Sequence, residues 1–306
     1  DNTTGNSNTA VGWTALANNT VGYSNSALGR NALYTNTTGD NNTAVGESTL
    51  YSNTTGWSNT AVGDDALYNN TSGSKNTAIG PKALYQSTTA YNNVAIGNAA
   101  IGGTNITGMN YNTSNASTIN NSNNTAIGNY ALLSNDAGSD NTAVGFDALK
   151  QNDSDDNTAV GYRALTENTS GEYNVGIGAY ALYENTTGST NTALGYWAQS
   201  NYMNTDLDNT TALGFGALCA ASDQIRIGDG NVTSIGGDVE WTNASDLRFK
   251  TNIKENALGL NFIKKLRPVT YNMDMDAIAR FRKTPDNLRR AEAEAKKAQI
   301  LQTGFI

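Results

Sequence analysis

A 17-residue repeat is the feature of this sequence that most limits the folds it can adopt. The block Asn-Thr-Ala-Val-Gly ends at Gly12, and related blocks end in a glycine at positions 29, 46, 63, 80 and 97, each 17 residues after the one before. The block that ends at Gly29 reads Asn-Ser-Ala-Leu-Gly. The block resumes at Gly128 and recurs at positions 145, 161, 178, 195 and 214, with steps of 16 to 19 residues. The 31-residue step from Gly97 to Gly128 leaves 14 residues beyond one repeat, which indicates a single insertion.

Each repeat keeps the same internal phase. An apolar residue follows four positions after the glycine and is nearly always preceded by Ala; these residues are Leu16, Leu33, Leu50, Leu67, Leu84, Ile101, Leu132, Leu149, Leu165, Leu182 and Leu218. A turn signal follows, as in Asn36-Thr37-Thr38-Gly39. The unit therefore predicts a short strand, a corner, a second apolar strand or turn, and a glycine corner.

A unit of 17 residues is too short for a helical hairpin or a propeller blade, and it fits one coil of a β-solenoid. We expect an all-β parallel β-solenoid, or β-roll, of about twelve 17-residue coils over residues 1–221, interrupted by the insertion at about 98–123. One coil cannot bury its few apolar atoms, so stacked coils are expected to bury a continuous column of Val, Leu and Ala. Glycine is expected at the corners, where the backbone needs a positive φ.

Stacking of identical coils predicts ladders of identical side chains. One asparagine ladder is expected at Asn8, Asn25, Asn42, Asn59, Asn76 and Asn93, and another at Asn36, Asn53, Asn70, Asn135, Asn152, Asn168 and Asn185. Side-chain amides in such ladders bond to the coils above and below. Tyr34, Tyr51, Tyr68 and Tyr85 share one phase and are expected to stack along a face.

Composition excludes several functional classes. Residues 1–200 hold 5 Lys/Arg against 14 Asp/Glu, so this array cannot neutralise nucleic-acid phosphates, and no nucleic-acid partner is expected. The chain has no histidine and one cysteine, Cys219, which excludes His-based catalysis, His metal sites and an intrachain disulfide; no cofactor is expected. No apolar run is long enough to span a bilayer, so no membrane insertion is expected in this segment.

The array over about residues 5–218 resembles the β-roll heads of trimeric autotransporter adhesins, which carry Asn-x-x-Ala-x-Gly units. The repeat here is longer than is usual for those heads, which leaves the shape of the coil open. The resemblance implies a homotrimer, in which three chains pack side by side and each keeps its own roll.

A second module follows the repeats. Ile225-Arg226-Ile227-Gly228 and residues 232–237 are expected to form the last strands of a neck over 222–244. Residues 241–253, with the core Ser-Asp-x-Arg-x-Lys, and residues 258–271, ending in Leu-Arg-Pro-Val-Thr-Tyr, are similar to the intramolecular chaperone domain of phage tailspikes and tail fibres. The match assigns 245–306 to the N-terminal part of that domain, which normally continues further, so the chain is expected to be a fragment.

The chaperone resemblance implies a specific chemistry. Three C-terminal domains associate, align three fibre chains, and are often released by self-cleavage before the motif serine. In this sequence the resemblance implies cleavage of the Ala244–Ser245 bond, with Ser245 as the nucleophile and Lys250 as its general base. Each chain would cleave itself once, and no external substrate is expected. A serine hydroxyl needs such a base, and a lysine serves when its pKa is lowered, for which Arg248 is a candidate neighbour. The alternative is that Ser245 caps a helix and Lys250 is a solvated charge.

The end of the chain has a different composition. Ala, Glu, Lys, Arg and Leu dominate from Pro285 onward, which predicts a helix by propensity, and Pro285-Asp286 fits its start. Ala291, Ala295 and Ala298 share one face, so three such helices would suit a trimer stalk. The C-terminal module is therefore expected to be small and α+β or helical.

These features favour a structural extracellular fibre or adhesin, on a bacterial cell surface or a phage tail. Its partner would be itself, with a cell-surface glycan or protein as receptor. The insertion is the candidate recognition element because solenoids tolerate loops on one face, and Asn105, Met109 and Tyr111 are its candidate binding residues. A disordered polar bulge is the alternative.

Two other functions remain as alternatives. A polysaccharide-degrading tailspike needs paired carboxylates in a cleft. The tight acidic clusters here, Asp64-Asp65 and residues 153–156, fall at turn positions and are expected to be solvated. An ice- or surface-binding solenoid would use stacked Thr residues, but those of the Asn-Thr-Thr turns fall at corners.

Overall fold

The computed structural model describes residues 3–103, 121–200 and 206–235, the segments 268–271 and 302–305, and the single positions 274, 276, 295 and 299. The chain divides into two compact units, Asp1–Gly236 and Gly237–Ile306. Each unit is described by itself.

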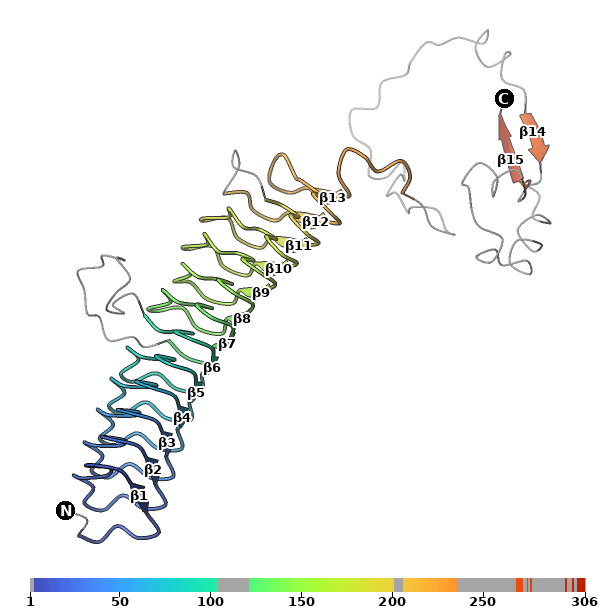
Figure 1. Ribbon diagram of the computed structural model, residues 1–306. Helices are drawn as coiled ribbons and strands as arrows, with labels where there is room; N and C mark the ends of the chain where they lie inside the picture. Colours follow the sequence, from blue (N-terminus) through green and yellow to red (C-terminus); the bar gives the residue numbers. More distant parts are fainter. Residues whose placement is uncertain are drawn as a thin grey trace, which may run out of the picture. The chain divides into compact units, whose positions relative to one another are not determined.

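The described part of the first unit contains one parallel sheet of thirteen strands, whose order in space is their order in the chain (Figure 1). Each strand has three residues, and successive strands belong to successive coils. The strands are β1 (Thr9–Val11), β2 (Ser26–Leu28), β3 (Thr43–Val45), β4 (Thr60–Val62), β5 (Thr77–Ile79), β6 (Val94–Ile96), β7 (Thr125–Ile127), β8 (Thr142–Val144), β9 (Thr158–Val160), β10 (Val175–Ile177), β11 (Thr192–Leu194), β12 (Thr211–Leu213) and β13 (Ile225–Ile227). The parallel β-solenoid predicted from the 17-residue spacing is confirmed.

The Ala-Leu segment of each repeat forms turns and not a second strand. Leu33, for example, has a φ of 52° and is fully buried. The neck was expected to contain two strands, and the described residues contain one. Ile225–Ile227 forms β13, whereas residues 232–235 form no strand.

The insertion does not interrupt the stack. Strands β6 and β7 pair in the register of all the others, with Ala95 opposite Ala126. The coil continues to Gly103, whose N–H donates to the Leu133 carbonyl at 2.9 Å, and it resumes by Asn121, whose side-chain amide donates to the Asn135 carbonyl at 2.6 Å. The extra chain therefore leaves and re-enters between Gly103 and Asn121.

The core is a column of alanine and leucine. The middle Ala of nearly every strand and the Ala-Leu pair of most turns are buried, as at Ala44, Ala66 and Leu67, which have no exposed surface. The expected column also included valine, and this part of the prediction is wrong. Side chains alternate across a strand, so the inward Ala forces its neighbours Thr and Val outward.

Both asparagine ladders are confirmed. In the first, the Asn59 backbone N–H donates to Oδ1 of Asn42 at 3.0 Å, and the Asn59 amide donates to the Gly73 carbonyl at 2.8 Å. In the second, the Asn53 amide donates to Oδ1 of Asn36 at 2.7 Å. These buried amides satisfy the backbone groups that the corners leave unpaired, which is why an interior so poor in large apolar groups is stable.

The tyrosine stack is also confirmed. The rings of Tyr34, Tyr51, Tyr68 and Tyr85 follow one another at centroid distances of 5.0–5.4 Å and are nearly parallel. This spacing is slightly above the 4.7–4.9 Å distance between neighbouring strands of a sheet. The stack therefore follows directly from the equal length of the first repeats.

In the second unit, β14 (Pro268–Tyr271) and β15 (Gln302–Phe305) form an antiparallel pair, with Val269 opposite Gly304. β14 is the Pro-Val-Thr-Tyr part of the chaperone motif. Most of the helix predicted from Pro285 onward lies outside the described residues; within this unit, the described positions Asp276 and Ala295 are helical.

Candidate functional site

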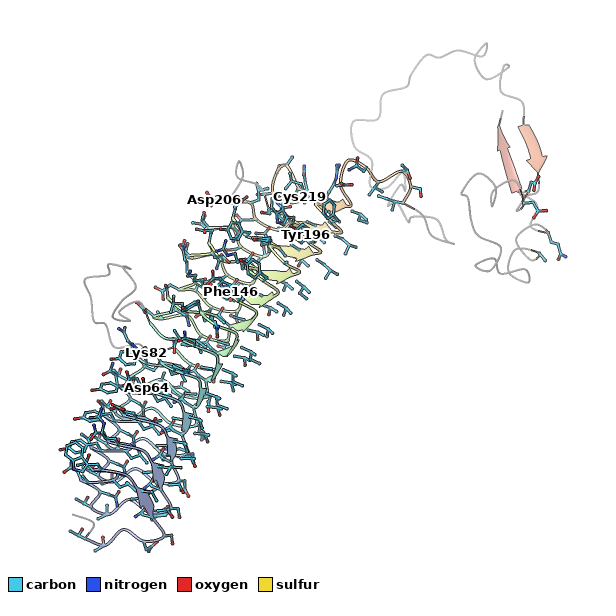
Figure 2. All side chains as sticks on the ribbon, in the orientation of Figure 1. Asp64, Lys82, Phe146, Tyr196, Asp206 and Cys219 are labelled. Carbon is cyan, nitrogen blue, oxygen red and sulfur yellow. The ribbon has the colours of Figure 1, made fainter. Side chains whose placement is uncertain are left out.

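The outer face of the thirteen-stranded sheet carries a continuous row of aliphatic side chains. The third residue of each strand points away from the lumen and pairs with the third residue of the next strand. The resulting aliphatic row consists of Val11, Leu28, Val45, Val62, Ile79, Ile96, Ile127, Val144, Val160, Ile177, Leu194, Leu213 and Ile227. Figure 2 shows side chains projecting from the strands along one side of this unit.

The aliphatic row is open to solvent in the single chain. Ile79, Ile127 and Ile177 are each 39% exposed, and Val11 is 55% exposed. The first residue of most strands, usually Thr, forms a second row beside it. A surface of aligned aliphatic side chains of this length is unusual for a monomer, and it marks an interaction face.

Covering this row would contribute substantial free energy. Full burial of such a side chain stabilises by about 1.5–3 kcal/mol, so covering an exposed fraction of about two fifths contributes about 0.6–1.2 kcal/mol. Over the seven side chains of the row that are 39–55% exposed the gain is about 4–8 kcal/mol, within the range of about 4–15 kcal/mol that association costs. The row alone therefore brings a second chain near the threshold of stable binding.

The acidic clusters lie in turns, and two carboxylates of the second cluster bond to the backbone of the coil before. Asp64, Asp153 and Asp155 are exposed, as predicted. Oδ1 of Asp153 accepts from the backbone N–H of Asp136 at 3.1 Å, and Oδ1 of Asp155 accepts from Ser139 at 2.7 Å. These carboxylates thus join neighbouring coils, so they do not form an opposed pair that could act as acid and base on a glycosidic bond.

Two turn carboxylates have perturbed ionisation. Desolvation, and then the charge of Asp64, raise the pKa of Asp65 above its ordinary value. Desolvation, followed by the charge of Asp153, raises the pKa of Asp136 in the same way. Both shifts come from partial burial between like charges, the expected result of stacking acidic turns.

One buried carboxylate could not be foreseen from the repeat. Asp147 is only 2% exposed, although the equivalent Asp65 lies at the surface of its coil. Lys150 approaches Asp147 at 3.3 Å and Arg163 approaches it from the next coil at 3.4 Å. Lys82 holds the position of Arg163 in the coil that follows Asp65, so Lys150 is the cation that Asp65 lacks.

Cys219 packs inside the last coils of the solenoid. It is buried, and its Sγ lies 3.4 Å from the Gln224 carbonyl oxygen. Desolvation raises the pKa of the thiol, which lowers its reactivity. Among the described residues, no group of three His, Cys, Asp or Glu side chains could hold a metal ion, and no helix is long and apolar enough to cross a membrane.

The residues predicted to carry chemistry or recognition lie outside the described residues. This applies to the cleavage bond Ala244–Ser245, to the general base Lys250, and to the candidate receptor residues Asn105, Met109 and Tyr111. The aliphatic row was not predicted from sequence. The alternation Thr-Ala-Val, with the smallest residue in the middle, is the signal that could have revealed it.

Comparison with known proteins supports the C-terminal assignment. Residues 245–306, roughly a fifth of the chain, match the model of the family described as the chaperone of endosialidase. No curated protein and no solved structure was found to match the chain. The C-terminal segment is therefore similar to the chaperone of endosialidase and follows a parallel β-solenoid, an order that fits a tail-fibre-type chaperone domain placed after repeats.

Proposed function

We propose that this chain is the structural shaft of an extracellular fibre or adhesin of the phage tail-fibre type, and that it works as a homotrimer. The observation that carries the proposal is the aliphatic row, because it runs along all thirteen strands and seven of its side chains are 39–55% exposed in one chain. Three parallel copies would cover their rows together. The likeness of residues 245–306 to a chaperone domain supports this, since such a domain aligns the chains whose rows must meet in register.

The proposed chaperone segment then leaves by self-cleavage. The Ser245 hydroxyl attacks the carbonyl carbon of Ala244 while Lys250 accepts the hydroxyl proton. The Ala244–Ser245 peptide bond breaks, its nitrogen takes a proton, and water hydrolyses the resulting ester. Each chain would react once and would leave a solenoid that ends at Ala244.

The insertion supplies the proposed receptor contact. The strands on either side of it, β6 and β7, pair in the common register, so a loop between Gly103 and Asn121 can vary without disturbing the stack. Asn105, Met109 and Tyr111 would contact a cell-surface glycan or protein.

Light scattering combined with intact mass spectrometry tests these steps together. The expected result is a trimer whose wild-type chains end at Ala244, while Ser245→Ala chains remain uncut. A trimer without cleavage in either sample would retain the fibre and refute the roles of Ser245 and Lys250. A monomer would refute the proposed assembly.

The threonines of the strands support a second candidate function, the binding of ice or of another regular surface. Thr43, Thr60 and Thr77 form a row on the flat sheet, away from the corners where the turn threonines lie. This row lies on the face that the trimer would cover, so both functions cannot operate at once. A monomeric chain that shows thermal hysteresis would favour this candidate, and a trimer without hysteresis would exclude it.

A further inference from the structure

Aromatic residues gather at one corner of the later coils. They occupy the first and second positions after the repeat glycine, and we call them the aromatic band: Tyr130, Phe146, Tyr162, Tyr180, Tyr196, Trp197 and Phe215. Their rings contact one another from coil to coil at centroid distances of 5.3–6.2 Å, from Tyr130 to Phe215. Phe146 and Tyr196 are labelled in Figure 2.

The solenoid does not need these rings. At the same corner the earlier coils carry mostly polar or charged side chains, such as Arg30, Glu47, Asp64 and Asn98. The interior is the same in both halves, with alanine, leucine and asparagine in equivalent places. The earlier coils fold with mostly polar residues at this corner. A contact with another molecule therefore explains the aromatic band better than a role in folding does.

The aromatic band is exposed in the single chain. Phe146, Tyr162, Tyr196, Trp197 and Phe215 are 38%, 44%, 49%, 45% and 64% exposed. A buried aromatic side chain covers about 150–250 Å², so these five rings leave about 500 Å² open. That is at the upper end of the apolar patch found on an ordinary monomer.

The polar neighbours of the band are also typical of a protein interface. The guanidinium of Arg163 lies 5.5 Å from the centre of the Tyr162 ring and forms an ion pair with the buried carboxylate of Asp147. Tyr, Trp and Arg are the residues that dominate binding energy at protein interfaces, especially when their side chains are fixed before the partner arrives.

We infer that a second copy of this chain covers the aromatic band, so that the band forms the tighter half of the self-association interface. The inference rests on the proposed function. The band begins two residues after the aliphatic row, as from Leu194 to Tyr196, so the two rows start within about 7 Å of each other. One neighbouring chain can cover both rows. Together the two rows approach the area of a standard interface, which is about 800 Å² per partner. The earlier coils have the aliphatic row but not the aromatic band, so their exposed apolar area is smaller.

Parallel copies in register would place the band of one chain beside the same coils of its neighbour. The contact would then be strongest in the coils of β8–β12 and weaker in those of β1–β6. These stronger coils are the ones nearest in sequence to the segment that resembles the chaperone, so assembly would begin in them and continue toward β1.

Site-specific photo-crosslinking in the full chain tests the inference. p-Benzoylphenylalanine is introduced in place of Tyr196 or, as the matched control, in place of Tyr51, which belongs to the tyrosine stack of the earlier coils and lies outside the aromatic band. Irradiation is expected to join chains at least ten times more efficiently from position 196 than from position 51. Equal or weaker crosslinking from position 196 in a sample that light scattering shows to be trimeric would overturn the inference and leave the proposed function standing.

A substitution series gives an independent readout. Phe146→Asn, Tyr162→Asn, Tyr196→Asn and Phe215→Asn together place at this corner the residue that Asn98 and Asn129 already hold there. The combined variant is expected to keep the circular dichroism spectrum of the wild type and to dissociate at a protein concentration at least tenfold higher. An unchanged dissociation concentration would contradict the inference, and a wild type that is monomeric at all concentrations would refute it together with the proposed function.

Discussion

The glycine after each strand gives the sharpest test of how closely the coils stack. Gly145 has a φ of +140°, a conformation that side chains rarely adopt. A Cβ at this position would lie 2.7 Å from the carbonyl carbon of Gly161 in the next coil, and closer still to its oxygen. We therefore expect Gly145→Ala to strain its own backbone and to push two coils apart.

The magnitude follows from these two effects. The unfavourable backbone conformation costs about 1–3 kcal/mol. Separating the coils weakens the bonds around the corner, among them the one from the Gly145 N–H to the Ile127 carbonyl at 2.8 Å. Two or three such bonds contribute about 0.5–1.5 kcal/mol each, so the total loss is about 3–6 kcal/mol. Urea denaturation followed by circular dichroism measures it.

Gly176 in β10 provides a control. Its φ is not positive, a Cβ there would come no closer than 3.2 Å to another atom, and the paired positions in the neighbouring strands hold Ala159 and Ala193. Gly176→Ala should cost less than half as much as Gly145→Ala. Equal losses for the two variants, or no loss for Gly145→Ala, would refute the argument that backbone contact between coils requires glycine.

Three further predictions concern the polar interior and the charged turns. Asn59→Ala leaves the Asn76 N–H without its partner and removes one of the two amides that donate to the Gly73 carbonyl, the other being that of Asn70, so it should cost about 2–4 kcal/mol in urea denaturation. Asp136 has a folded-state pKa above its unfolded value, so its contribution to stability is present at low pH and is lost as pH rises above about 4. Asp136→Asn should therefore raise the melting temperature at pH 7 and leave it unchanged at pH 3; the reverse pattern would contradict the sign of the shift. Asp147→Asn should cost about 1–3 kcal/mol in the same urea assay, because Arg163 loses a buried partner, whereas an unchanged midpoint would show that the ion pair is dispensable.

Much of the solenoid could be predicted from the sequence, because in a stacked repeat the spacing along the chain determines which residues are in contact. Residues 17 positions apart must meet when coils stack, so the ladder through Asn42 and Asn59 and the stack through Tyr51 and Tyr68 followed from phase alone. The direction of each side chain did not follow. Valine was placed in the core by its hydrophobicity, whereas the narrow lumen accepts alanine and so sends valine outward.

The charged and aromatic corners could not be predicted from the repeat. Asp65 and Asp147 occupy the same position, yet only Asp147 is almost fully buried, because Lys150 and Arg163 surround it. Such differences depend on neighbours in adjacent coils, and the sequence gives them no common pattern. The aromatic band was overlooked for the same reason, since its members alternate between two positions of the unit.

The central claim is that chains associate along the aliphatic row, and the mass of the assembly in solution tests it most directly. In the Ser245→Ala background, which is expected to stay uncut, the 32.2 kDa chain should form a species of three times that mass, about 97 kDa, by light scattering. Ile79→Ser, Ile127→Ser and Ile177→Ser together should give monomers, because each removes an aliphatic group that is 39% exposed on the row. The control combines Val21→Ser, Tyr91→Ser and Tyr173→Ser, which are 47%, 53% and 57% exposed and lie outside the strands and outside the aromatic band, and it should remain trimeric. A trimer that survives the row substitutions, or a control that dissociates equally, would contradict the claim.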